Sequence, residues 1–268
     1  MTRGLLLTAI IVPMACWGHF PPGVEYKVFQ FPEGKLPVID GNPDDWAMVA
    51  AEYTLDGSYL EDTVMGKGPN MDPEDLKVQV TVGWSPVTNR LYFLYKMWDD
   101  MHNFNPERGD IFEVVLDADH NGGRYHTYDD VTPPIEAKLK STTCQNYHIF
   151  TPPAPGKAWA WVWGSQQWLI EQPWAEYAYQ YDFAMNQPGW LCLEFYITPL
   201  NYASYLGVEY SAFHKLIEGE IIGLSWSVLD YDEHDDRYEG FWNLSHATRM
   251  DRTADLLPNF RLMPLTAK

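Results

Sequence analysis

The stretch LKVQVTVGWSPVTNRLYFLYKMW, residues 76–98, decides the fold class. In its first part Val78, Val80 and Val82 alternate with other residues, so their side chains share one face of an extended strand. The segment SPVTNR at residues 85–90 carries turn-forming residues, and the aromatic run LYFLYKMW brings the chain back. The stretch therefore predicts an antiparallel β-hairpin.

Similar runs follow towards the C-terminus. DIFEVVLD, residues 110–117, is almost continuously apolar, which is typical of a central strand. Other β-branched or aromatic runs bounded by turn residues are NYHIF, AWAWVW, YAYQYDF, WLCLEFYI, IIGLSWSVLDY and NFRLMPL. Helical periodicity is scarce: we expect a short turn carrying Trp46 with Asp44 as its N-cap, and residues 202–220 could include one helix. We predict an all-β fold, one antiparallel β-sandwich of jelly-roll or immunoglobulin-like type with one or two short helices.

Composition and charge limit the classes of possible binding partner. Of the 268 residues 46% are hydrophobic and 15% aromatic, enough for a sizeable core. There are 37 acidic and 18 basic residues, which gives a net charge of −19. Nucleic acid and anionic membrane surfaces both demand a basic face, so we exclude them as partners. Bound cations and neutral sugars are compatible with this balance.

The first residues have the order of an export signal. Arg3 precedes the apolar run LLLTAIIV at residues 5–12, and the small residues of MACWG suit cleavage. The run is shorter than the ~20 residues of a membrane span. We predict a signal peptide at residues 1–18, a surface leader at 19–35, one domain at 36–268, and a secreted, periplasmic or cell-surface protein. A buried first strand and lipid attachment at Cys16 are the alternatives.

Removal of the signal peptide leaves Cys144 and Cys192. An even number of cysteines in an exported protein favours a disulfide, and we predict this pair. Two buried free thiols are the alternative.

The stretch AWAWVWGSQQWLIEQPW, residues 158–174, is rich in tryptophan. On a strand Trp159, Trp161 and Trp163 would share one face. Large aromatic residues are mostly buried, so we expect this row mainly in the core, although such a row also suits stacking on sugar rings. Trp168 and Trp174 lie among glutamines that could bind hydroxyl groups, so we expect them to be exposed. The alternative is that both indoles are packed beneath a long loop.

A possible calcium loop follows the run at residues 110–117. Asp117, Asp119 and Asn121 alternate before Gly122, which lets a tight loop point several oxygens at a hard cation. Tyr128 occupies the position where an EF-hand has glutamate, so the loop is not an EF-hand. We predict structural Ca²⁺ here, with a simple turn as the alternative. The acidic run at residues 230–236 could host a second cation or be a solvated loop.

Four blocks in order, VIDGNPDDWAMVA, LKVQVTVGW…NRLYFLYKMWDD, GDIFEVVLDADHNGG and GFWNLS…NFRLMPL, resemble carbohydrate-binding module family 9. The resemblance implies a β-sandwich, structural calcium and sugar binding, often alongside xylan- or cellulose-degrading activities. Asp110 and Glu113 match the acidic positions of the family's D-x-x-E strand, and Asp117 matches its acidic end.

The sequence departs from the family in the sugar clamp. Sugar-binding members hold a glucose ring between two tryptophans, and Glu107 and about Asp251 occupy those places here. A different aromatic platform is therefore predicted. Its residues are Trp98, Trp163, Trp168, Trp174, Glu107 and Arg108.

We predict an exported, non-catalytic protein that binds a polysaccharide or oligosaccharide and acts with carbohydrate-degrading enzymes. No catalytic residue is assigned. The first alternative is a glycoside hydrolase whose carboxylate pair would come from Asp99, Asp100, Glu171 and Glu194. The second is a haem-b electron-transfer domain of similar fold, with axial ligands from Lys96, Met97 and Met101.

Overall fold

The predicted hairpin forms and lies at the centre of one sheet. In the computed structural model, β4 (Leu76–Ser85) and β5 (Arg90–Asp99) pair antiparallel over their whole length. The model describes residues 21–106, 108–232 and 237–265, so the predicted signal peptide at 1–18 lies outside the described residues. None of the helices in these ranges is both long and apolar enough to cross a lipid bilayer.

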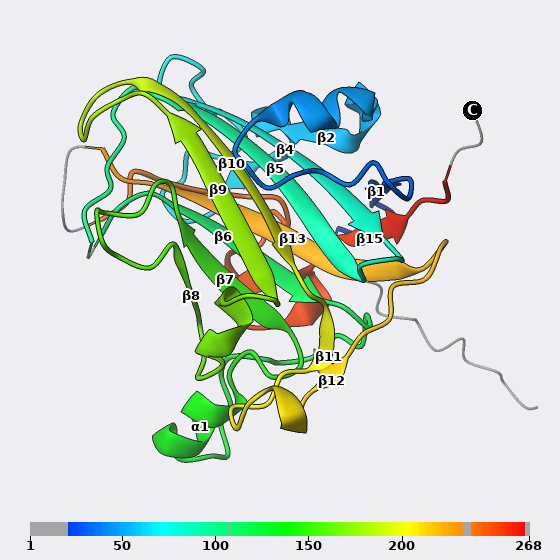
Figure 1. The fold of residues 1–268 in the computed structure, drawn as a ribbon. Helices are drawn as coiled ribbons and strands as arrows, with labels where there is room; N and C mark the ends of the chain where they lie inside the picture. Colours follow the sequence, from blue (N-terminus) through cyan, green and yellow to red (C-terminus); the bar gives the residue numbers. More distant parts are fainter. Residues whose placement is uncertain (1–20, 107, 233–236, 266–268) are drawn as a thin grey trace, which may run out of the picture.

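Two packed sheets form a β-sandwich, as predicted (Figure 1). The β5 sheet has the order β1-β4-β5-β10-β9, and β2 pairs with β4. Its further strands are β10 (Gly189–Ile197), β9 (Ala175–Tyr181) and β2 (Thr54–Asp56). The β6 sheet has the order β8-β7-β6-β13-β15-β1, and β14 joins β13 to β3. Its strands are β8 (Ala160–Val162), β7 (Gln145–Phe150), β6 (Ile111–Asp117), β13 (Ile221–Asp230), β15 (Asn259–Leu262), β14 (Gly240–Asn243) and β3 (Glu61–Asp62).

The strand β1 (Glu25–Gln30) corrects two predictions. Its first part pairs parallel with β15, and Phe29 and Gln30 pair parallel with β4. The strand therefore belongs to both sheets, and its Val28 is fully buried. The prediction of a surface leader at residues 19–35 is wrong for residues 25–31, whereas residues 32–35 are exposed or half-buried. The sandwich is also not wholly antiparallel.

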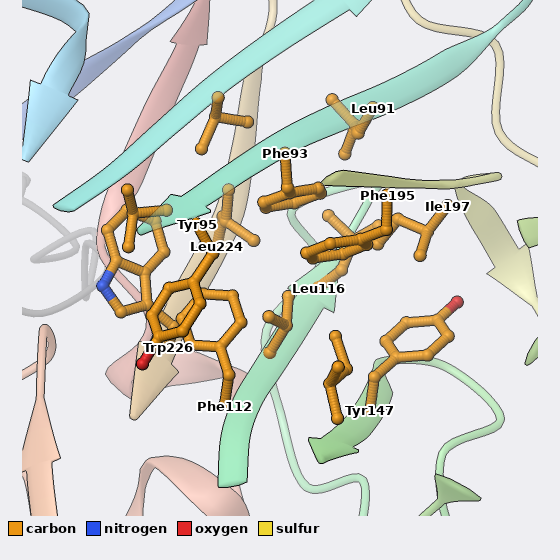
Figure 2. Close-up of a cluster of buried hydrophobic side chains, with 14 of the residues drawn as sticks. Leu91, Phe93, Tyr95, Phe112, Leu116, Tyr147, Phe195, Ile197, Leu224 and Trp226 are labelled. Carbon is orange, nitrogen blue, oxygen red and sulfur yellow. The ribbon is translucent and has the colours of Figure 1, made fainter. Parts of the chain in front are cut away.

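The core lies between the sheets and follows from period-2 alternation (Figure 2). Phe93 of β5 stacks on Phe195 of β10, with ring centroids 4.6 Å apart, and Tyr95 stacks on Phe112 of β6 at 4.2 Å. Trp226 of β13 packs beside Phe112 at 6.4 Å. The Tyr95–Phe112 stack thus joins the two facing sheets, and the other two contacts extend it within each sheet.

The connections hold short elements. The single α-helix among the described residues is α1 (Pro133–Leu139), which the sequence analysis did not predict. The 3-10 helices are η1 (Pro43–Met48), η2 (Ala51–Tyr53), η3 (Gly57–Tyr59), η4 (Gln167–Ile170), η5 (Val208–Tyr210), η6 (Thr248–Asp251) and η7 (Ala254–Leu256). Residues 202–220 hold η5 and part of the hairpin of β11 (Leu200–Tyr202) and β12 (Ala212–Phe213), and no α-helix. The predicted helical turn with Trp46 is η1. Its N-cap is Asn42, whose side-chain oxygen accepts a hydrogen bond from the Asp44 N–H, so the prediction of Asp44 as N-cap is wrong.

The predicted disulfide is absent. Cys144 and Cys192 are free and buried. Cys144 packs with Val115 and Tyr125 on the outer side of the β6 sheet. Cys192 packs with Phe31 and others on the outer side of the β5 sheet. The sandwich core separates the two thiols, so they cannot approach the ~5–6 Å between Cα atoms that a disulfide needs.

Candidate functional site

A polar row crosses the outer face of the β6 sheet. Glu113 of β6 lies opposite His148 of β7, and His148 lies opposite Trp161 of β8. On the other side Glu113 faces Ser227 of β13. Because neighbouring residues in these strands fill the core, alternation directs this row away from it.

Glu113 and His148 of this row line a cavity of about 320 Å³, near the lower end of the size range of small-molecule sites. One wall comes from the loop and 3-10 helix before β15, which contribute Arg249, Asp251 and Arg252. Tyr238 and Phe241 of the β14 region also line it. We call this cavity the Glu113 pocket. Its lining residues are Val64, Glu113, His148, Trp163, Leu229, Tyr238, Phe241, Thr248, Arg249, Asp251 and Arg252.

Glu113 is almost completely buried at the floor of the pocket. Asn146 Nδ2 donates a hydrogen bond of 2.7 Å to Glu113 Oε1, and His148 Nε2 lies 3.8 Å from the same oxygen. Burial raises the pKa of Glu113 to about 7; the Asn146 hydrogen bond opposes this rise and the charge of Asp251 adds to it. Burial also lowers the pKa of His148 to about 3, so His148 is neutral at physiological pH. Glu113 therefore changes charge near neutral pH inside a binding-sized cavity.

Aromatic rings pack around His148, the neighbour of Glu113 in this row. The His148 ring stacks on Trp161, with centroids 4.2 Å apart and an interplanar angle of 16°. Trp163 meets His148 edge-on at 5.2 Å, and His126 meets Trp163 at 3.9 Å. Trp161 and Trp163 are half-buried, so both indoles retain some exposed surface. The pocket thus combines a flat aromatic side with a polar floor.

Several buried polar atoms on this face have no hydrogen-bond partner. These atoms are His126 Nε2, Asn146 Oδ1, His148 Nδ1, Ser225 Oγ and Ser227 Oγ. Buried polar groups in folded proteins are normally paired with protein groups or water. Of these residues His148 lines the Glu113 pocket, and the others lie on the same face outside its lining. Aromatic surface together with unpaired hydroxyl, amide and imidazole groups suits a sugar, which offers C–H faces and hydroxyl groups.

The structure does not gather the predicted sugar-binding residues in one place. Trp163 lines the Glu113 pocket. Trp98 lies on the outer face of the β5 sheet, where Lys77 Nζ is 3.9 Å from its ring centroid. Trp168 Nε1 donates to the Ser204 carbonyl, and Trp174 packs on Phe213 at 4.8 Å.

Both indoles, Trp168 and Trp174, are half-buried, which agrees with the alternative of packing beneath a loop rather than with the predicted exposure. Arg108 is exposed in the segment before β6. Glu107 lies outside the described residues. Trp168 and Trp174 meet edge-on with ring centroids 6.0 Å apart, but Trp98 and Trp163 lie on the outer faces of different sheets, so the four indoles do not form one surface. Sugar binding by these residues stays a prediction.

The tryptophan row also differs from the prediction. Only residues 160–162 form a strand, and Ala160 and Val162 face the core. Trp161 and Trp163 therefore point outward, while Trp159 precedes the strand and is buried. His148 and Asn146 were not predicted as residues of this pocket, and Trp161 was expected mainly in the core. Alternation of small with large residues in AWAWVW was the available signal.

The predicted calcium loop folds as a tight turn. Asp117 is buried and its Oδ2 accepts the Gly122 N–H at 2.8 Å. Asp119 is half-buried and Asn121 is exposed. Calcium at Asp117, Asp119 and Asn121 stays a prediction.

The residues predicted for the glycoside hydrolase and for the haem-b domain do not come together in one site. Glu194 accepts hydrogen bonds from Trp46 Nε1 at 2.7 Å and from the Gly41 N–H at 2.8 Å, so it anchors the segment before η1. Glu171 is exposed, and Asp99 and Asp100 lie at an edge of the sandwich, away from the Glu113 pocket. Lys96 and Met97 are consecutive on β5 and point to opposite faces, with Met97 in the core. They cannot both ligate one haem iron.

Comparison with known proteins identifies the fold. No protein-family model and no curated protein matches the chain. Two solved structures of a carbohydrate-binding module of family 9 from Caldicellulosiruptor kristjanssonii are similar to it. The one in complex with glucose has a TM-score of 0.54 and 14% identity, over 91% of this chain and 98% of that chain. The one in complex with cellotriose has a TM-score of 0.55 and 15% identity, over 91% and 95%. The chain thus has the fold of these family 9 modules.

Proposed function

We propose that this protein is an exported, non-catalytic carbohydrate-binding protein that holds a saccharide in the Glu113 pocket. The observation that carries the proposal is the set of unpartnered polar atoms beside the Trp161 and Trp163 indoles. Export is supported by Arg3 and the apolar run at residues 5–12. In this role the protein would act together with enzymes that degrade the bound carbohydrate.

The modules with the same fold support this choice, since their structures contain glucose and cellotriose. The chemistry of the pocket agrees with it. The Glu113 carboxylate accepts strong hydrogen bonds from hydroxyl groups when it is ionised, and Asn146 holds it in place. A net charge of −19 favours a neutral ligand over an anionic one.

The pocket also differs in design from a clamp of two tryptophans. Asp251 stands on its wall, close to Arg252, whose Nε lies 3.5 Å from Asp251 Oδ2. Such charged groups can fix the orientation of ring hydroxyls, while Trp163 supplies apolar surface on one side. We therefore expect a pyranose to lie with one face against the aromatic side and its hydroxyl groups towards Glu113.

Isothermal titration calorimetry with glucose, cellotriose and a panel of plant, algal and microbial glycans tests the proposal. We expect at least one saccharide to bind, and Trp163→Ala to weaken that binding at least tenfold, or about 1.4 kcal/mol. Trp190→Ala is the matched control, because Trp190 is 51% exposed on the outer face of the β5 sheet. Binding lost in Trp190→Ala and kept in Trp163→Ala would place the site on the other sheet. No binding to any glycan would overturn the function.

A glycoside hydrolase is the second candidate, and one observation favours it. Glu113, with its pKa raised to about 7 by burial, lines the same pocket as Asp251, whose pKa is also raised by burial. A protonated carboxyl beside a second carboxylate is the equipment of a glycosidase. Release of reducing sugar from a glycan that binds, lost in both Glu113→Gln and Asp251→Asn, would establish it. Binding without turnover would remove it.

A further inference from the structure

A second row of side chains crosses the outer face of the β5 sheet. Four neighbouring strands contribute one residue each, paired in register: Gln79 of β4, Lys96 of β5, Cys192 of β10 and Gln180 of β9. The residues on either side of them in these strands fill the core, so alternation directs this row outwards. The row therefore lies on the sheet opposite to the one that carries the Glu113 pocket.

A cavity of about 620 Å³ lies over this row, well within the size range of small-molecule sites. We call it the Lys96 cavity, and its lining includes the row together with Trp190 and Asp182. Cys192, in the middle of the row, has the smallest side chain of the four and is only 9% exposed. The cavity is deep at this point because a small residue stands between the longer Lys96 and Gln180.

Trp190 gives the cavity an aromatic side. Its indole is 51% exposed, although large aromatic residues are mostly buried. Trp190 lies opposite Trp98 of β5, and the Trp98 ring is covered by Lys77, whose Nζ lies 3.9 Å from the ring centroid. Within the described parts of the chain, no aromatic ring and no cation contacts the Trp190 indole. It therefore presents a flat apolar surface to the cavity.

Lys96 places an uncompensated positive charge on the floor. Its side chain is half-buried, and no carboxylate in the ranges that the model describes forms an ion pair with it. The neighbouring Gln79 is uncharged, and burial raises the pKa of Cys192 to about 11, so its thiol is neutral as well. In a protein with a net charge of −19, a lysine without a carboxylate partner is available to an anionic group.

The groups around the cavity favour an aromatic ring that carries a carboxylate. The Lys96 ammonium group suits the carboxylate, and the Trp190 indole suits the ring. Asp182 is exposed, follows β9, and lies on the other side of β10 from Lys96, where it can accept a hydrogen bond from a ring hydroxyl. A sugar carries hydroxyl groups around its whole edge, for which the Trp190 face and the Cys192 thiol offer poor partners.

We propose that the Lys96 cavity binds an aromatic carboxylate, with the carboxylate group on Lys96 and the ring against Trp190. A hydroxyl group on the far side of the ring donates to Asp182. The amide groups of Gln79 and Gln180 supply further hydrogen bonds at the floor. The site is on the other sheet from the Glu113 pocket and does not depend on saccharide binding.

Isothermal titration calorimetry of the full protein with 4-hydroxycinnamate tests the site. We expect the wild type to bind it, and to bind the neutral 4-hydroxycinnamyl alcohol roughly tenfold more weakly, since the alcohol keeps the ring and its hydroxyl group and lacks the charge. Lys96→Gln and Trp190→Ala should each weaken binding of the acid roughly tenfold, whereas Lys96→Arg should retain it. Lys157→Gln removes an exposed lysine outside the cavity and is the matched control. Saccharide binding in the Glu113 pocket should be the same in all these variants.

Several results would overturn the proposal. One is the absence of 4-hydroxycinnamate binding in the wild type. Others are equal affinity for the acid and the alcohol, or an unchanged affinity in Lys96→Gln, since Lys96 would then not hold the carboxylate. Glucuronate that binds as tightly as 4-hydroxycinnamate would show that charge alone is recognised and would exclude an aromatic ligand. If Lys96→Gln does not fold, the comparison of acid and alcohol on the wild type decides.

Discussion

Replacing Glu113 by glutamine is expected to change how the stability of the protein depends on pH. Burial raises the pKa of Glu113 from 4.5 to about 7, so between these values the folded state binds the proton more tightly than the unfolded state. The contribution of this group to stability is therefore fully present below pH 4.5 and is lost as the pH rises through 7. At about 1.4 kcal/mol for each pH unit, the loss is on the order of 3 kcal/mol.

Glutamine keeps an oxygen that can accept the Asn146 Nδ2–H and carries no charge at any pH. The variant should therefore have a free energy of unfolding similar to that of the wild type at pH 4.5 and higher by roughly 3 kcal/mol at pH 8. His148 does not contribute to this pH-dependent difference in the free energy of unfolding, because burial lowers its pKa to about 3 and it stays neutral over this range. Other titrating groups are present in both proteins and cancel in the difference.

Urea unfolding from pH 4.5 to 8.5 at constant ionic strength measures this difference. Glu171→Gln removes an exposed carboxylate and is the matched control, for which the difference from the wild type should not vary with pH. A difference between Glu113→Gln and the wild type that is equally flat would refute the argument, since Glu113 would then titrate alike in the folded and unfolded states.

Three further predictions concern other parts of the molecule. Dithiothreitol should leave Tm unchanged, and Cys144 should react with a thiol reagent only on unfolding, because it is free and buried; a lower Tm after reduction would contradict this. Gly83→Ala should lower stability by about 1–3 kcal/mol in urea unfolding, since the added Cβ overlaps the Phe31 ring; an unchanged midpoint would show that Phe31 moves freely. Saccharide affinity should fall as the pH drops below 7 in the wild type, because protonation removes a hydrogen-bond acceptor from Glu113, and should stay constant in Glu113→Gln. If calorimetry gives the same pH dependence of affinity for both proteins, Glu113 does not take part in binding.

Local alternation was enough to predict the long strands. The predicted strands at residues 76–84 and 91–98 each match an observed strand to within one residue at either end. Both faces of such strands are set by the pattern of apolar residues, and the partner is the next strand along the chain. By contrast β1 was taken for a surface segment. It pairs with β15, near the other end of the chain, and sequence pattern carries no information on so distant a partner.

The direction of the tryptophans could not be predicted from residue type. The preference of large aromatic rings for the interior put Trp161 and Trp163 in the core. In the structure Val162 lies opposite Tyr147, which already fills the core at that point, so a small side chain fits there. The neighbouring indoles are consequently on the outer face. Packing density across strands, rather than hydrophobicity along one strand, decides this arrangement.

The D-x-x-E strand shows how one short segment directs carboxyl groups to two places. Positions three apart on an extended strand point to opposite faces. Asp110 therefore turns towards the edge of the core, where burial and the charges of Asp99 and Asp230 raise its pKa, whereas Glu113 turns to the outer face and its pocket. Asn146 of β7, the strand beside β6, holds the Glu113 carboxyl group. Asp110 instead accepts hydrogen bonds from the backbone N–H groups of Asn103 and Tyr231, which lie outside the strands. The spacing of this acidic motif thus directs one carboxyl group to the edge of the core and the other to the pocket on the outer face.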